Sequence, residues 1–206
     1  MPAVVIAAHQ MRVCLSTLRA MNKSKNTAGA AAALCAACCA FVVPACAQGW
    51  RPDGYFVQGG GGDDRTWNAT AGLTWAWRWR RSVPGAEVGG ITEGFVSHWS
   101  APSGDGRKGF TQAGVLPVFR LRFDQGRSEW FAEGGIGLSV MDQHFVTPGK
   151  QMSTSFNFVD VLGIGRSFDA DGRRELGLRL QHLSNAGIRL PNPGQNFWQL
   201  RYASAF

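Results

Sequence analysis

Residues 47–206 contain no cysteine, and residues 1–47 contain no acidic residue. The first absence excludes disulfides, thiolate nucleophiles and cysteine zinc sites from most of the chain. Only 17% of residues are charged, below the usual quarter of globular proteins. The chain is nevertheless 45% hydrophobic and 11% aromatic, which excludes a disordered protein. Its 27 glycines disfavour a helical bundle, because glycine costs roughly 1 kcal/mol per helical site relative to alanine.

The acid-free segment 1–47 has the pattern of a secretory signal peptide. A basic start precedes a small, apolar run at 27–43, and an A-x-A site ends at Ala47. The apolar run is shorter than the roughly 20 residues of a membrane-spanning helix. We expect cleavage after Ala47, with Met21 as the true start. Acylation of Cys46, as in a lipoprotein, is the weaker alternative.

Removal of this leader changes the charge of the protein. The whole chain carries +7, but four of its 21 Lys and Arg residues and none of its 14 Asp and Glu residues lie in the leader. The remaining single domain, 48–206, therefore carries +3. This modest charge argues against a nucleic-acid partner.

The domain alternates between apolar and polar residues with a period of two. In the segment 66–80, Trp67, Trp75, Trp77 and Trp79 share one parity, whereas polar, small and basic residues occupy the other. Successive residues of a strand point to opposite faces, so this pattern predicts a long strand between two different environments. Eight such segments are expected, bounded by glycine, proline and aspartate turns, at 54–61, 66–80, 85–99, 115–123, 129–140, 153–168, 175–181 and 198–206.

These strands predict an eight-stranded antiparallel transmembrane β-barrel of the outer-membrane type. Several are as long as the roughly 9–11 residues that cross a bilayer, and aromatic outer faces fit lipid. Backbone groups must pair in lipid, so the sheet must close. The competing fold is a soluble secreted barrel whose tryptophan face points inward.

Charged residues on the polar face are expected to fill the barrel as ion pairs. The candidates are Arg120, Arg122 and Arg179 with Glu129 and Glu133. An eight-stranded barrel is filled by side chains and leaves no channel.

The chain ends in an aromatic strand. Phe206 shares its parity with Tyr202 and Trp198. This ending resembles the signal by which the barrel assembly machinery recognises bacterial outer-membrane proteins.

A histidine and a serine continue the apolar face of one predicted strand. Leu178 and Leu180 set the parity that His182 and Ser184 share. Side chains two residues apart on one face can meet, and a histidine can then take the hydroxyl proton and activate the serine. A substrate that reaches this face would be a lipid. On spacing alone, an interfacial histidine beside a capping serine is the more common explanation.

The longer string His182–Gly194 reads H-L-S-N-A-G-I-R-L-P-N-P-G. It resembles the C-terminal signature of the lipid A 3-O-deacylase (PagL) family, which consists of eight-stranded enzymes of the bacterial outer membrane. The resemblance implies that His182 is the general base and Ser184 the nucleophile. It implies a serine esterase that removes the 3-hydroxyacyl chain at position 3 of lipid A, within lipopolysaccharide, without a cofactor or metal.

The resemblance also assigns supporting roles after the serine. Asn185, with the backbone amides near Ala186 and Gly187, would form the oxyanion hole, and Asn192 would hold the following loop. Such donors stabilise the tetrahedral intermediate of acyl transfer.

One position departs from the family pattern. The family has a glutamate shortly after P-N-x-G that orients the histidine, and this chain reads Gln195-Asn196 there. Either amide could accept a hydrogen bond from the imidazole ring and fix its tautomer. The alternative function is therefore a weak or inactive barrel with a structural or adhesive role. Expected partners are lipopolysaccharide and outer-membrane lipids, and the sequence leaves a homodimer open.

Overall fold

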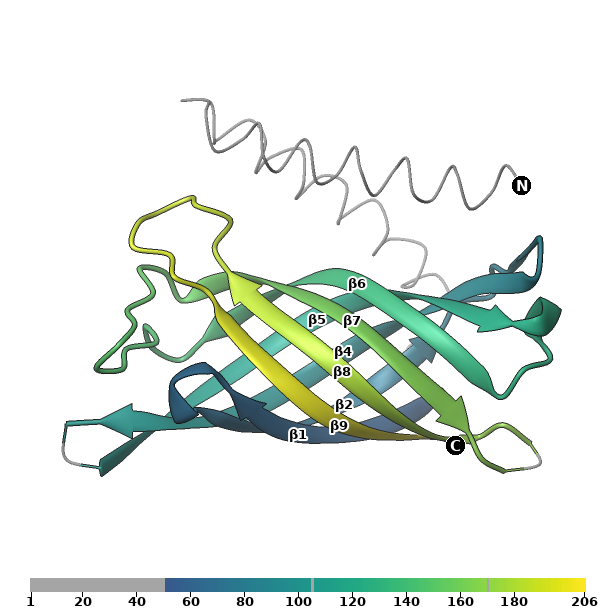
Figure 1. The fold of residues 1–206 in the computed structure, drawn as a ribbon, viewed down its shortest axis with the longest axis horizontal. Coiled ribbons are helices and arrows are strands. Elements are labelled where there is room, and N and C mark those ends of the chain that lie inside the picture. Colours follow the sequence, from purple (N-terminus) through teal and green to yellow (C-terminus); the bar gives the residue numbers. More distant parts are fainter. Residues whose placement is uncertain (1–50, 105, 170) are drawn as a thin grey trace.

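The described residues form a closed antiparallel β-barrel, which is drawn in Figure 1. The structure is a computed structural model that describes residues 51–104, 106–169 and 171–206; the expected leader lies outside this part. Two short 3-10 helices, η1 (Asp63–Arg65) and η2 (Asp124–Gly126), lie in turns. The strands are β1 (Gly54–Gly62), β2 (Trp67–Ala76), β3 (Arg81–Val83), β4 (Ala86–Ser103), β5 (Gly106–Phe123), β6 (Trp130–Met141), β7 (Phe156–Ser167), β8 (Arg174–Ser184) and β9 (Gln195–Ala205).

Eight of these strands form the barrel wall, as the sequence predicted. β1 pairs with both β2 and the last strand, β9, and β2 pairs with β4, which closes the sheet. The short β3 pairs only with the start of β4. Strand β2 ends at Ala76, earlier than the predicted end at Arg80, because the chain turns there into β3. Among the described residues, no helix is long and apolar enough to cross a membrane.

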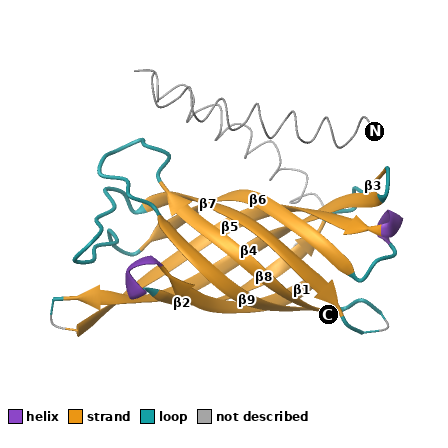
Figure 2. Ribbon diagram, viewed as in Figure 1, coloured by secondary structure: helices purple, strands orange, loops and turns teal. Residues whose placement is uncertain are grey.

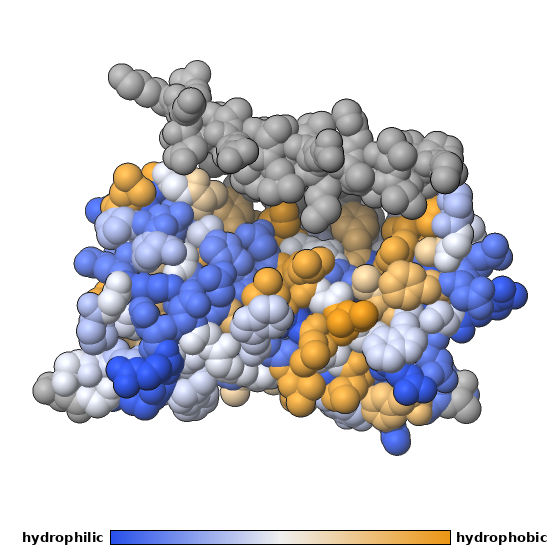
Figure 3. Space-filling model, in the orientation of Figure 1, coloured by the Kyte–Doolittle hydropathy of each residue, from blue (hydrophilic) through white to orange (hydrophobic). Residues whose placement is uncertain are grey.

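The outer face of the wall is apolar, as the alternation predicted. On β8, Leu176 and Leu178 are exposed, whereas Arg179 and Gln181, which follow with the opposite parity, are buried. The soluble alternative, with its tryptophans inside, is excluded by the exposure of Trp67, Trp130 and Trp198. Figure 3 shows apolar side chains gathered over the strands, with polar side chains nearer the loops at the left. This outer surface suits lipid.

The barrel interior has two zones. Near the loop end, aromatic and aliphatic side chains fill it: Trp99, Phe110, Phe145, Met152, Leu183 and Phe197. Towards the other end, the filling is charged. Arg179 is only 1% exposed; it forms ion pairs with Glu133 and, at 2.8 Å, with Glu93. Arg120 joins the network through Glu133 at 3.0 Å.

The prediction of paired interior charges is confirmed for Arg120, Arg122 and Arg179, and it was wrong for Glu129. Glu129 lies on the outside and pairs with Arg166 at 2.7 Å, with more than half of both side chains exposed. It precedes the start of β6, so strand alternation does not set its direction. The sequence analysis missed Glu93 as an interior partner.

The two ends of the barrel differ. The turn with η1, the β4–β5 hairpin, the β6–β7 loop (142–155) and the β8–β9 loop (185–194) share one end, at the left in Figure 2. The C-terminus lies at the opposite end. His182 and Ser184 lie near the loop end, since β8 ends at Ser184.

Candidate active site

His182 and Ser184 lie on the outer face of the barrel, at the loop end of β8. Both are half-buried and follow the parity of Leu178 and Leu180, whereas Leu183 between them is fully buried in the interior. The alternation of β8 therefore places the predicted base and the predicted nucleophile on the lipid-facing wall. Their side chains emerge about 7 Å apart along the strand.

Asn196 is the hydrogen-bond partner of His182. The two residues are opposite each other in the β8–β9 ladder, and His182 Nδ1 lies 2.7 Å from Asn196 Oδ1. A carbonyl oxygen only accepts, so the ring must donate through Nδ1. This leaves Nε2 free to accept a proton.

Gln195, the other candidate for this role, lies inside the barrel. Its side chain is fully buried and donates through Nε2 to the backbone oxygen of Asp63 at 3.0 Å. Because β9 begins at Gln195, the two neighbouring amides point to opposite faces, and only Asn196 reaches the ring.

A carboxylate lies directly behind Asn196. Asp63 of η1 accepts hydrogen bonds through Oδ2 from the Asn196 amide at 2.9 Å and from its backbone N–H at 3.3 Å. Lys150 of the β6–β7 loop pairs with the same oxygen at 2.8 Å. The hydrogen bond from Lys150, with those from Asn196, holds the pKa of Asp63 below its usual range, so the group stays ionised.

The residues after Ser184 form a hydrogen-bonded turn. The Ala186 N–H donates to Ser184 Oγ at 3.4 Å, and Ala186 has a positive φ of 53°. The Gly187 N–H donates to Asn185 Oδ1 at 3.0 Å. Of the two backbone amides expected in an oxyanion hole, only that of Ala186 thus points at the serine.

The Asn185 side chain stabilises the loop. It is fully buried, and its Nδ2 donates to Ser153 Oγ at 3.1 Å and to the backbone oxygen of Arg189 at 2.7 Å. Its backbone N–H donates to Asn192 Oδ1 at 3.0 Å, which links the start of the loop to Asn192. Both amide hydrogens of Asn185 are therefore engaged away from Ser184.

A second carboxylate lies beside the histidine. Asp160 of β7 is the cross-strand neighbour of His182 on the outer face and interacts with it electrostatically. In the described part of the chain, no hydrogen bond joins the side chains of His182 and Ser184. Catalytic hydrogen bonds commonly form only once substrate is bound.

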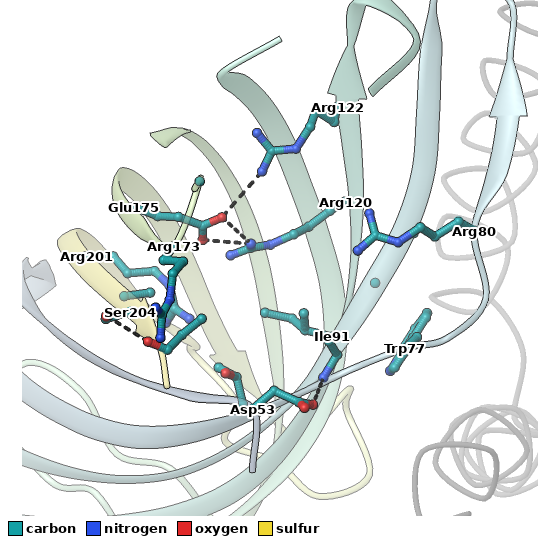
Figure 4. Close-up of a pocket in the computed structure, with 17 residues that line it drawn as sticks. Asp53, Trp77, Arg80, Ile91, Arg120, Arg122, Arg173, Glu175, Arg201 and Ser204 are labelled. Atoms are coloured by element: carbon teal, nitrogen blue, oxygen red, sulfur yellow. Dashed lines mark hydrogen bonds and ion pairs between the residues drawn. The ribbon is translucent and has the colours of Figure 1, made fainter. Parts of the chain in front are cut away.

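A partly open cavity in the barrel lies at the opposite end from these residues. Figure 4 shows charged side chains converging on it, with Glu175 between Arg120 and Arg122. Its volume is about 260 Å³, and the ion pair from Glu175 to Arg120 measures 2.7 Å. The cavity belongs to the charged filling of the barrel and does not reach His182.

Comparison with known proteins identifies the family. The family model described as lipid A 3-O-deacylase (PagL) matches residues 66–205. The chain belongs to the PagL family. This finding confirms the resemblance drawn from the string that begins at His182.

Two curated PagL proteins support the assignment. Lipid A deacylase PagL of Bordetella bronchiseptica is 34% identical over 111 residues, which are 54% of this chain and 59% of that protein. Lipid A deacylase PagL of Pseudomonas aeruginosa is 32% identical over 133 residues, which are 64% of this chain and 73% of that protein. The chain thus matches less than two thirds of the length of the Bordetella relative.

A solved PagL structure has the same barrel. It is described as the crystal structure of the outer membrane enzyme PagL and superimposes with a TM-score of 0.65 at 26% identity. The match covers 74% of this chain and 99% of that one. The barrel described above is accordingly a protein of the bacterial outer membrane.

The sequence pattern did not indicate two residues of this site, Asp63 and Lys150. Asp63 lies 133 positions before Asn196, in a turn that carries no motif. Lys150 lies in the β6–β7 loop, and its Nζ donates to the Gly194 backbone oxygen at 3.1 Å as well as to Asp63.

Proposed function

We propose that this protein is an outer-membrane serine esterase that removes the ester-linked 3-hydroxyacyl chain at position 3 of lipid A. The observation that carries the proposal is the oriented His182 beside Ser184 on the lipid-facing wall. A nucleophile outside the barrel is accessible to a substrate that lies in the bilayer. Membership of the PagL family supplies the substrate class.

Ser184 is the nucleophile of the proposed reaction. Its Oγ attacks the ester carbonyl while His182 Nε2 takes the hydroxyl proton. The tetrahedral intermediate collapses, His182 returns the proton to the sugar 3-oxygen, and the acyl chain remains on Ser184. Water, deprotonated by His182, then attacks the acyl-enzyme, and the 3-hydroxy fatty acid leaves.

The Ala186 N–H is the oxyanion donor that we assign to this site. It is the amide that points at Ser184 Oγ, and the substrate's carbonyl oxygen develops its charge beside that atom during attack. Gly187 and Asn185 act indirectly, by holding the turn that presents this amide. Removal of one such donor costs about 10²–10³ in rate in a serine protease.

Asn196 takes the place of the family glutamate as the residue that orients His182. It fixes the ring but carries no charge to stabilise the imidazolium. Asp160, the outer-face neighbour of His182, is a carboxylate close enough to supply part of that charge.

Mass spectrometry of lipid A tests the proposal. Cells that express the protein should lose one 3-hydroxyacyl group from lipid A, and Ser184→Ala should reduce this loss by roughly 10³-fold or more. Ser204→Ala is a matched control, since Ser204 lies at the other end of the barrel and, among the described residues, its hydroxyl bonds only to the Ala205 backbone oxygen. Both variants should reach the membrane folded, as judged by heat-dependent gel migration.

Unchanged lipid A in cells with a folded wild-type barrel would overturn the esterase. That outcome would favour the structural or adhesive function.

We further infer that segment 1–47 directs export and that the terminal strand directs assembly. N-terminal sequencing of the membrane form should begin at Gln48.

Phe206 is 64% exposed at the end of the aromatic row with Tyr202 and Trp198, and Phe206→Ala should lower the yield of assembled barrel. Cross-linking in membranes tests the homodimer, which the sequence leaves open.

A further inference from the structure

Asp63 is joined to His182 through a single amide. Its Oδ2 accepts from Asn196 Nδ2 at 2.9 Å, and Asn196 Oδ1 lies 2.7 Å from His182 Nδ1. Asp63 comes from the β1–β2 turn, whereas His182 and Asn196 belong to β8 and β9. The closure of the barrel brings these distant segments together, because β1 pairs with β9.

The direction of the Asn196 amide decides the tautomer of His182. An amide has a donor end and an acceptor end of nearly equal size. With its oxygen towards the ring, Asn196 requires a proton on Nδ1 and leaves Nε2 as a base. With its nitrogen towards the ring, it would donate to Nδ1, and the proton of the neutral ring would move to Nε2, where it blocks base catalysis.

Asp63 selects between these two directions. An ionised carboxylate only accepts hydrogen bonds, so the donor end of Asn196 must face it. The hydrogen bond from Lys150, together with those from Asn196, lowers the pKa of Asp63 and keeps it ionised. The backbone N–H of Asn196 also donates to Asp63, at 3.3 Å, which fixes the relative position of the two residues.

We propose that Asp63 is a positioning residue of the esterase, which orients Asn196 so that neutral His182 carries its proton on Nδ1 and presents Nε2 to Ser184. This inference rests on the proposed function, and it assigns to two residues the role that a glutamate has in the family. Asp63 acts on His182 through the orientation of Asn196 more than through its charge, because Lys150 balances that charge by an ion pair at 2.8 Å.

Nitrogen-15 NMR of the folded protein in micelles tests the tautomer without any activity. The wild-type ring should carry its proton on Nδ1, with the signals assigned by comparison with His182→Gln. In Asp63→Asn, the new amide offers a donor as well as an acceptor, so Asn196 can reverse and a large share of the ring should move to the Nε2 tautomer. An unchanged tautomer in folded Asp63→Asn would overturn the proposal.

Asp64→Asn is the matched control for the NMR experiment. Asp64 lies in the same turn and accepts from Thr147 Oγ1 at 3.2 Å, but no hydrogen bond links it to Asn196 in the described part of the chain. It should leave the tautomer unchanged. A shift of equal size in Asp64→Asn would mean that any disturbance of the turn moves the ring, and would overturn the specific role of Asp63.

Kinetics in two backgrounds provide a second test. In the natural background, Asp63→Asn should lower kcat tenfold or more while KM stays within about twofold, because ring orientation matters only for proton transfer. In Asn196→Glu, no amide can reverse, so the same change should be neutral or should raise kcat by removing a neighbouring negative charge. Equal losses in both backgrounds would indicate a merely structural role and overturn the proposal.

The two tests distinguish this inference from the proposed function. If the wild-type protein leaves lipid A intact but Asp63→Asn still shifts the tautomer, the positioning role stands and the substrate assignment fails. If lipid A is deacylated and the tautomer does not respond, the proposed function stands and the positioning role fails.

Discussion

Among the described residues, the imidazole of His182 makes one hydrogen bond, the 2.7 Å bond to Asn196, and this bond helps to orient the ring. An amide in this position fixes the tautomer as a carboxylate would, but it offers no charge to the imidazolium. The exposed position of Asn196 on β9 means that little packing depends on it. Its removal should therefore affect catalysis much more than folding.

Asn196→Leu should leave a folded barrel with little activity. Leucine has a similar shape but no acceptor for the Nδ1 proton, and the wrong tautomer has cost about 10⁴ in rate in a serine protease. We expect a loss approaching that size in the initial rate of lipid A deacylation in mixed micelles. A rate within a few-fold of wild type would contradict the role given to Asn196.

The residue pattern predicted which face His182 and Ser184 occupy, but not all of their neighbours. The leucines of β8 set the parity that places His182 and Ser184 outside. The choice between Gln195 and Asn196 depended on where β9 begins, and the predicted strand began only at 198. Asp63 was beyond prediction, because its contact with Asn196 arises from closure of the sheet between β1 and β9.

At the scale of elements, the β8–β9 loop is fitted closely to the histidine. Gly194 has a positive φ of 70°, and a Cβ there would lie 2.7 Å from His182 Cε1. Within the same loop, Asn185 donates hydrogen bonds to the Asn192 side chain and to the Arg189 backbone oxygen. The loop therefore helps to fix the position of the ring as well as to cover the barrel end.

Gly194→Ala should impair both the backbone and the ring. Alanine at a positive φ destabilises by about 1 kcal/mol, and its methyl group would also displace the His182 ring. We expect at least a tenfold loss of deacylation. Gly172→Ala isolates the backbone effect, since Gly172 has a φ of 63° and open space around it, in the β7–β8 turn at the other end.

Equal activity losses in the two glycine variants would contradict the steric argument. Thermal unfolding of both proteins gives the backbone cost separately.

At the scale of the whole molecule, the charged half of the interior joins strands that are distant in sequence. Arg179 of β8 reaches Glu93 of β4 and Glu133 of β6. The alternation predicted that arginines would face inward, but it could not choose their partners. Partner choice depends on which strands face each other across the closed barrel.

Arg179→Leu should destabilise the barrel strongly. It would remove the cation that Glu93 and Glu133 share and leave them only Arg201 and Arg120 as partners. Breaking a buried ion pair costs about 3–5 kcal/mol. Arg166→Leu removes an exposed pair with Glu129 and should cost at most about 1 kcal/mol. Urea unfolding in lipid vesicles measures both, and equal midpoints would contradict the importance of the interior network.

The outward position of Ser184 determines which measure of substrate concentration sets the reaction rate. Because Ser184 faces lipid, the proposed esterase would meet lipid A by lateral diffusion in two dimensions. The rate should depend on the mole fraction of lipid A in the bilayer or micelle that holds the protein, not on its molar concentration in the bulk solution. Adding inert detergent at constant lipid A will slow the reaction by surface dilution, although neither the protein nor the substrate has become scarcer.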